Sequence, residues 1–155
     1  VDFVDIDLET GNLSVTALQD KLRVAKQNKL LPKVVIPVHL AGQSCDMAAI
    51  NKLAKEYGFK VIEDASHAIG AKYKNKPVGN CSYSNITVFS FHPVKIITSA
   101  EGGMAVTNCE ELNKKMKRLR SHGITNNPDE MTEPSHGPSS TDGRGTPWRL
   151  VLSTN

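Results

Sequence analysis

Short apolar runs alternate with amphipathic segments over the first 125 residues, and this alternation constrains the fold more than any other feature. The runs 33–40 (KVVIPVHL), 60–65 (KVIEDA) and 86–91 (ITVFSF) are the right length for buried strands. Between the strands, apolar residues recur at steps of three and four, which indicates helices. Buried strands alternating with helices predict an α/β fold, with a mostly parallel sheet and flanking helices on both faces.

Local signals place the remaining elements. Helices are expected over 15–25 and from Asp46, a candidate N-cap, to Gly58. Further expected elements are an opening strand at 3–8, a hairpin at 71–78, a strand at 103–107 and a helix that ends at Gly123.

Composition excludes several classes of protein. The chain has 155 residues, of which 39% are hydrophobic, within the range of globular domains. It has no apolar stretch long enough for a transmembrane helix, and its first residues lack the pattern of a signal peptide. The net charge is +3, and the one basic cluster, at 114–120, lies on a helical pattern. We therefore expect a solvated helix face and neither a nucleic-acid nor a membrane partner.

The cysteines and histidines do not indicate a metal site or a disulfide framework. Cys45, Cys81 and Cys109 are odd in number and far apart, and no C-x-x-C pair exists. Free, buried thiols in a chain without a secretion signal predict a cytoplasmic protein. The five histidines lack the helical i, i+4 spacing of metal ligands.

Polar residues at the carboxyl ends of the predicted strands are candidates for a site, because ligands gather at that edge of a parallel sheet. Asp64 ends one strand and points away from Glu63. It could anchor a cationic ligand group or serve as a cap or loop acceptor. Lys95 follows another strand and could supply a nucleophilic amine or be a solvated surface group. Ser90 could donate to a phosphate or to the backbone.

Motifs of several other enzyme classes are missing. The sequence contains no G-x-S-x-G, no phosphate-binding G-x-x-x-x-G-K-[ST], and no G-x-G-x-x-G after its first strand. A nucleotide-binding oxidoreductase is therefore disfavoured. A non-catalytic α/β ligand-binding module with a structural Lys95 remains an alternative.

Three segments in order resemble one family. They are EDASHAIGA (63–71), FSFHPVK (89–95) and EGG (101–103), and together they resemble the DegT/StrS family of pyridoxal-phosphate-dependent sugar aminotransferases. The resemblance extends from Val1 to about Thr125. Within the family, PVHLAGQ (37–43) and HPVKII (92–97) are most similar to members that aminate a UDP-linked 4-keto-6-deoxy amino sugar in pseudaminic acid biosynthesis.

The resemblance implies a role for each matching residue. Lys95 would be catalytic, holding pyridoxal 5′-phosphate as a Schiff base and then moving a proton. Asp64 would pair with the pyridinium nitrogen, and Ser90 would bind the cofactor phosphate. His67 stands near the ring hydroxyl, where many relatives carry Gln. Family members that dehydrate their substrate have His in place of Lys95, so the lysine favours transamination, with glutamate as the amino donor.

The family pattern also implies that parts of the fold are missing. Members are much longer, with an N-terminal segment that binds the phosphate, a C-terminal small domain and a partner subunit in a homodimer. We therefore expect residues 1–125 to be the central part of the large domain of a fold-type I transferase, a fragment that is inactive alone. Residues 126–155 are expected to be an irregular or disordered tail, and 135–155 indicate a truncated or frame-altered end.

Overall fold

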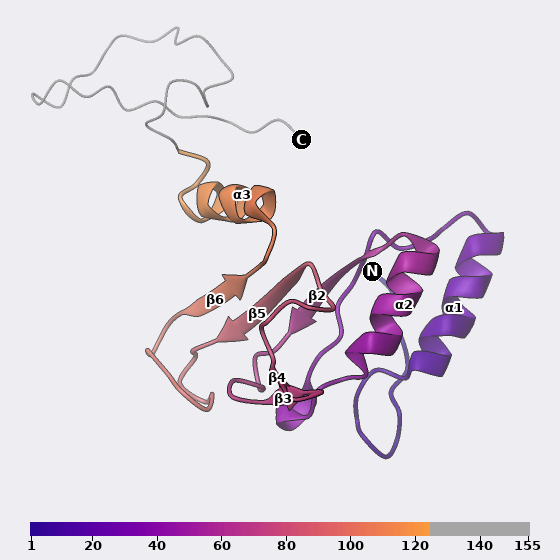
Figure 1. Ribbon diagram of the computed structural model, residues 1–155, viewed down its shortest axis with the longest axis horizontal. Coiled ribbons are helices and arrows are strands. Elements are labelled where there is room, and N and C mark those ends of the chain that lie inside the picture. The colour runs from indigo at the N-terminus through magenta and orange to yellow at the C-terminus, as the bar shows by residue number, and fades with distance from the viewer. Residues whose placement is uncertain (125–155) are drawn as a thin grey trace, which may run out of the picture. The chain divides into compact units, whose positions relative to one another are not determined.

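The computed structural model describes residues 1–124, and its elements follow the predicted alternation (Figure 1). Two α-helices, α1 (Val15–Gln27) and α2 (Met47–Tyr57), precede most of the strands, and a short 3-10 turn, η1, covers Leu40–Gly42. A third helix, α3 (Glu110–Arg120), lies in a separate unit that begins at Glu110. The strands are β1 (Val34–Val35), β2 (Lys60–Asp64), β3 (Lys72–Tyr73), β4 (Lys76–Pro77), β5 (Ile86–Ser90) and β6 (Gly103–Val106).

Four of these strands form one mixed, mostly parallel sheet in the order β1-β2-β5-β6. Strands β1, β2 and β5 run parallel, with Val35 opposite Val61 and Asp64 opposite Val88. Strand β6 runs antiparallel to β5, so that Ser90 faces Gly103. The predicted α/β class is confirmed. The expected hairpin is also present, as the separate antiparallel pair β3-β4.

The prediction of an opening strand over residues 3–8 is wrong, because the structure has no strand there. In this segment only Ile6 makes a β-bridge, to Leu13, and the Asp7 carboxylate accepts hydrogen bonds from the backbone N–H groups of Glu9 and Thr10. An aspartate that bonds its own following backbone stabilises a turn rather than a ladder. Of the apolar residues that suggested a strand, only Val4 packs against the core, whereas Phe3, Ile6 and Leu8 are exposed, with Leu8 at 93%.

Strand β1 is also shorter than predicted. Pro37 has no N–H to contribute to a ladder. Pairing with β2 therefore stops after Val35 and resumes only as a single parallel bridge between Val38 and Asp64.

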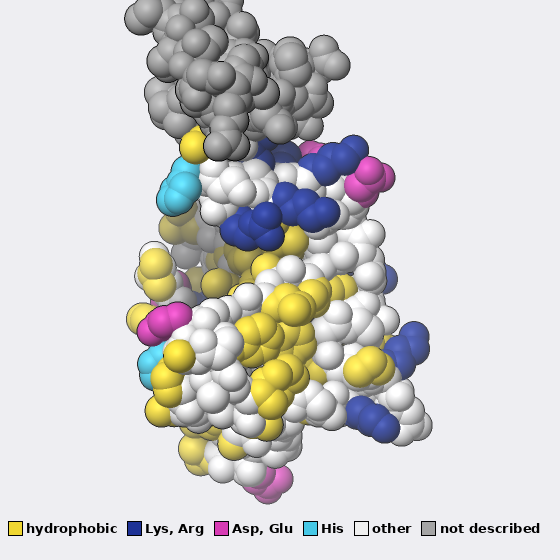
Figure 2. All heavy atoms as spheres, turned by 90° about the vertical axis from the view of Figure 1, so that its left-hand side faces the viewer, with side chains coloured by type: hydrophobic (Ala, Val, Ile, Leu, Met, Phe, Trp, Pro, Cys, Tyr) yellow, Lys and Arg dark blue, Asp and Glu magenta, His cyan; other side chains and the backbone are white. Residues whose placement is uncertain are grey.

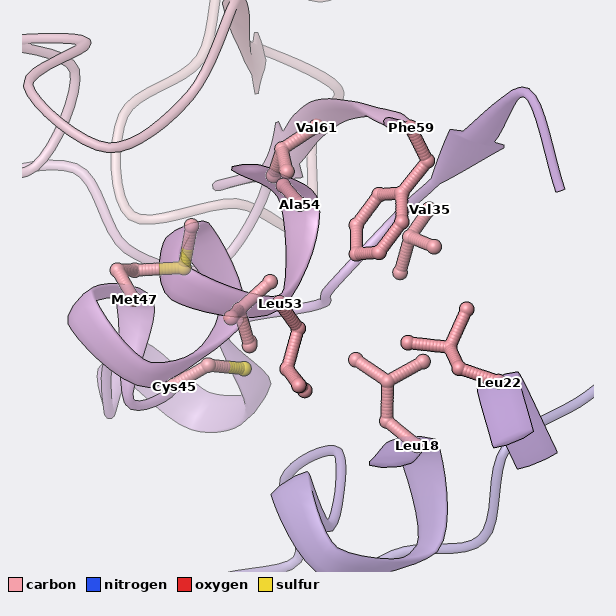
Figure 3. Packing of buried hydrophobic residues seen from close by; sticks show 10 residues of the cluster. Leu18, Leu22, Val35, Cys45, Met47, Leu53, Ala54, Phe59 and Val61 are labelled. Carbon is pink, nitrogen blue, oxygen red and sulfur yellow. The ribbon is translucent and has the colours of Figure 1, made fainter. Parts of the chain in front are cut away.

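The main core lies between α1, α2 and one face of the sheet (Figure 3). Helix α1 contributes Leu18 and Leu22, which are each 2% exposed, and α2 contributes Leu53. These side chains cluster with Val35 and Phe59. As predicted, Asp46 caps α2 by accepting from the Ala49 N–H, and Gly58 ends it with a φ of 81°.

The opposite face of β1 is not covered by the described residues, contrary to the prediction of helices on both faces. Val35 and Pro37 are buried, whereas Val34 and Ile36 are 43% and 56% exposed. Because α1 and α2 both pack against the Val35 face, the alternating side chains on the other face remain open. Hydrophobic side chains also gather on another side of the molecule, the one that lies at the left in Figure 1 (Figure 2).

Two other sequence-based expectations concern the surface. The basic cluster on α3 is an exposed helix face, as predicted, with ion pairs from Lys114 to Glu110 and from Lys115 to Glu111. Of the three free cysteines, Cys45 and Cys81 are buried, but Cys109 is exposed, so the burial predicted for it is wrong.

Among the described helices, none is long and apolar enough to cross a membrane. The predicted tail lies outside the described residues.

Candidate functional site

The carboxyl ends of β2 and β5 bring two of the predicted site residues to the same edge of the sheet. Strand β2 ends at Asp64, which pairs with Val88 of β5. Strand β5 continues for two more residues and ends at Ser90. The pairing continues past β2, because the Ala65 N–H donates to the Val88 carbonyl at 2.8 Å. The parallel register therefore fixes the relative positions of Asp64 and Ser90.

Asp64 is held on both sides by its main chain. Its N–H donates to the Pro37 carbonyl at 2.9 Å, and its carbonyl accepts from the His39 N–H at 3.0 Å. The half-buried Asp64 carboxylate accepts a hydrogen bond from the Ser66 N–H at 3.0 Å. Asp64 therefore serves as a loop acceptor, one of the two roles that the sequence allows for it. Glu63 points to the opposite, buried face, as strand alternation predicts.

Lys95 lies in the connection between β5 and β6. The connection begins after Ser90, whose hydroxyl accepts from the His92 N–H at 3.4 Å. The Lys95 N–H then donates to the His92 carbonyl at 2.9 Å, which forms a tight turn. The Phe91 carbonyl accepts from both Thr98 Oγ1 and the Ser99 N–H, which closes the loop around a half-buried Lys95.

An open hollow of about 240 Å³ contains Lys95 and His67, so the structure brings these two predicted residues together. Asp64 and Ser90 lie at the neighbouring strand ends and do not line the hollow. Its lining is Ala41, Ser66, His67, Val94, Lys95 and Ile96.

The turn after β1 forms one wall of this hollow. Ala41 has a φ of 51°, and Gly42 has a φ of 89° and approaches the His67 carbonyl so closely that a Cβ there would lie 3.3 Å from it. The roles of Ala41 and Ser66 as lining residues were not predicted. The rule that ligands gather at strand ends points to their segments, but it does not select individual residues.

The side chains at this edge fit the chemistry of pyridoxal phosphate. The cofactor needs an amine, a carboxylate near a ring nitrogen and hydroxyl donors for its phosphate. Lys95, Asp64 and Ser90 supply these three groups from adjacent elements. Within residues 1–124, no cluster of three or more His, Cys, Asp or Glu side chains could hold a metal ion.

The mostly parallel sheet with flanking helices places the chain among α/β proteins, which bind ligands at the carboxyl ends of their strands. The chain belongs to the DegT/DnrJ/EryC1/StrS aminotransferase family, whose profile matches residues 1–149. The match continues beyond Thr125, where the resemblance seen in the sequence ends.

Individual relatives agree with this membership. The UDP-4-amino-4,6-dideoxy-N-acetyl-beta-L-altrosamine transaminase of Campylobacter jejuni is 44% identical over 124 residues, which are 80% of this chain and 31% of that protein. Helicobacter pylori PseC, an aminotransferase involved in the biosynthesis of pseudoaminic acid, superposes with a TM-score of 0.72 at 39% identity. The superposition covers 81% of this chain and 32% of PseC.

A structure from Streptococcus pneumoniae, described as the PLP-form of a sugar aminotransferase, matches with a TM-score of 0.62 at 30% identity, over 80% of this chain and 35% of that one. The chain thus spans about a third of the length of the relatives it matches.

Proposed function

We propose that residues 1–125 are the central part of the large domain of a sugar-nucleotide aminotransferase. The complete protein would transfer an amino group from glutamate to a UDP-linked 4-keto-6-deoxy amino sugar, with pyridoxal phosphate as its cofactor. The observation that carries this proposal is the position of Lys95, half-buried in a hollow beside His67 at the edge that Asp64 and Ser90 share. Family membership and the printed function of the C. jejuni relative support it.

Pyridoxal phosphate supplies an aldehyde that binds amines covalently and a ring that withdraws electrons from the substrate carbon. Lys95 Nζ would hold the cofactor and would then move a proton to and from the reacting carbon. The Asp64 carboxylate would pair with the ring nitrogen and keep it protonated, because an opposite charge favours the charged form. The Ser90 hydroxyl would donate to the phosphate, and His67 would lie near the ring hydroxyl.

The complete protein would have further parts around this segment. The open face of β1 and the open hollow suit a protein that completes its site with an N-terminal segment, a small domain and the second subunit of a homodimer. We accordingly propose that this chain is inactive alone. A cytoplasmic location is proposed from the free cysteines, because a reducing compartment keeps thiols unpaired.

Covalent labelling tests the role of Lys95. The chain is mixed with pyridoxal phosphate, reduced with borohydride and digested, and the labelled lysines are identified by mass spectrometry. Lys95 should carry most of the label, and Lys95→Ala should lose it, whereas Lys60→Ala at the other end of β2 should not. Equal labelling of Lys95 and the exposed lysines would support the alternative, an α/β ligand-binding module with a structural lysine.

Amino transfer itself is tested in a protein of full family length that contains these residues. With ¹⁵N-glutamate and a UDP-linked 4-keto-6-deoxy amino sugar, the label should appear on the sugar product. If the cofactor is bound and no ¹⁵N reaches the sugar, the proposed reaction is wrong.

A further inference from the structure

A buried polar cluster lies beneath the candidate site and is not used by it. We call it the His39–Glu63 network, which consists of His39, Glu63, Ser84 and Thr87. His39 and Thr87 are 0% exposed and Glu63 is 5% exposed. Such residues are costly to bury unless their polar atoms are paired, so their contacts define what the cluster does.

Both oxygens of Glu63 accept hydrogen bonds within the network. His39 Nε2 lies 2.9 Å from Oε2. Thr87 Oγ1 donates to Oε1 at 3.2 Å, and the Ser84 hydroxyl donates to the same oxygen. Because His39 follows β1 while Glu63 and Thr87 belong to β2 and β5, a single carboxylate joins the three parallel strands on their buried face.

Three of the four network residues lie a short distance along the chain from part of the candidate site. Glu63 immediately precedes Asp64, and Thr87 is three residues before Ser90 on β5. His39 immediately precedes η1, which contains Ala41 in the wall of the hollow.

His39 also ties the turn to β2 through other atoms. Its Nδ1 accepts from the Cys45 N–H at 3.2 Å, beyond η1, and its own N–H donates to the Asp64 carbonyl at 3.0 Å. A shift of His39 would therefore move Asp64 and the Ala41 wall together with respect to Lys95, which lies in a separate loop.

We propose that His39, Glu63 and Thr87 are positioning residues that hold Asp64 and the wall of the hollow in register with Lys95. This inference rests on the proposed function. A network that only stabilises the fold would make the same contacts, but it would affect the site no more than an equally destabilising change elsewhere.

The test compares substitutions at two points along the β2-β5 pair, one within the network and one outside it. Thr87→Val removes one donor to Glu63 at nearly constant shape, and Thr87→Ser restores a hydroxyl. The control is Asn85→Ala, because Asn85 Oδ1 accepts from the Val61 N–H at 2.9 Å and joins β2 to β5 at their amino ends. All variants of the chain are compared at the same interval below their own Tm.

Two quantities are measured: the share of pyridoxal phosphate label on Lys95 after borohydride reduction, and hydrogen exchange of the Ser66 amide, which donates to Asp64. Thr87→Val should lower the Lys95 share by about tenfold, since small displacements at a reacting group have large effects on rate. Thr87→Ser should restore the share, and Asn85→Ala should leave it unchanged. Ser66 exchange should accelerate only in Thr87→Val.

Two further variants keep the test informative if Thr87→Val does not fold. His39→Asn keeps an acceptor for the Cys45 N–H but loses the donor to Glu63, and Glu63→Gln keeps the shape but loses the charge. Both should behave as Thr87→Val does. Equal labelling in these variants and Asn85→Ala would overturn the positioning role. Failure of the unmodified chain to label Lys95 preferentially would instead overturn the proposed function.

Discussion

His39 Nε2 lies 2.9 Å from Glu63 Oε2, and both side chains are removed from solvent where β1 and β2 approach the candidate site. Burial raises the pKa of the Glu63 carboxyl, but hydrogen bonds from His39, Ser84 and Thr87 outweigh burial and hold the pKa below its ordinary value. Glu63 is therefore a carboxylate at neutral pH although it is buried.

This contact predicts a dependence of stability on pH. Because the pKa of Glu63 is lower in the folded than in the unfolded chain, its contribution is fully present above the unfolded pKa of about 4.3. That contribution is lost as pH falls through the folded pKa. Denaturant unfolding between pH 7 and pH 3 should show this loss. Glu63→Gln should cost about 1–3 kcal/mol at pH 7 and flatten the acid limb of the curve. An unchanged acid limb would contradict the assignment to Glu63.

The packing of α1 and α2 in the main core should make a large contribution to the free energy of unfolding. Leu22→Ala should lower the free energy of unfolding by about 2–5 kcal/mol, because it leaves a cavity among Leu53, Phe59 and their neighbours. Val24→Ala on the same helix, where the side chain is 56% exposed, should cost less than about 0.5 kcal/mol. Urea unfolding measures both, and equal losses would mean that α1 does not pack as described.

The start of α2 is stabilised by a pair of side chains. Asp46 Oδ1 accepts from the Ala49 N–H at 3.2 Å and from Tyr73 Oη at 2.6 Å, which links the helix to the β3-β4 hairpin. Asp46→Ala should cost about 1–2 kcal/mol. Tyr73→Phe should cost less, because the N-cap bond remains. A double-mutant cycle by thermal unfolding should show that the two losses are not additive, and strict additivity would exclude the contact in solution.

Gly103 allows β5 and β6 to pair closely. A Cβ at this position would lie 2.8 Å from the Phe89 carbonyl oxygen, which is a backbone atom that cannot move alone. Gly103→Ala should therefore separate the two strands, lower the Tm and reduce labelling of Lys95, whose loop they enclose. Met104→Ala, at a side chain 50% exposed on the same strand, is the matched control and should change neither. Wild-type labelling in Gly103→Ala would show that the loop does not depend on this pairing.

The elements that could be predicted are those whose signals are local. The caps at Asp46 and Gly58, the recurrence of Leu18 and Leu22, and the opposed directions of Glu63 and Asp64 each depend on a few neighbouring residues. The opening strand failed because the apolar residues around Ile6 have only one bridging partner, a fact no local pattern contains.

The sequence by itself determined the α/β class and the family, because residue types and their order are enough for each. It also predicted Lys95, Asp64, Ser90 and His67 as candidate site residues. Only the tertiary structure decided that Lys95 and His67 share a hollow, and that His39, Glu63 and Thr87 meet beneath it. These contacts join residues more than twenty positions apart. Their geometry depends on the register of three parallel strands. Hydrophobic alternation decides which face each side chain takes, but a slip of two residues keeps every face, so alternation alone does not select the register.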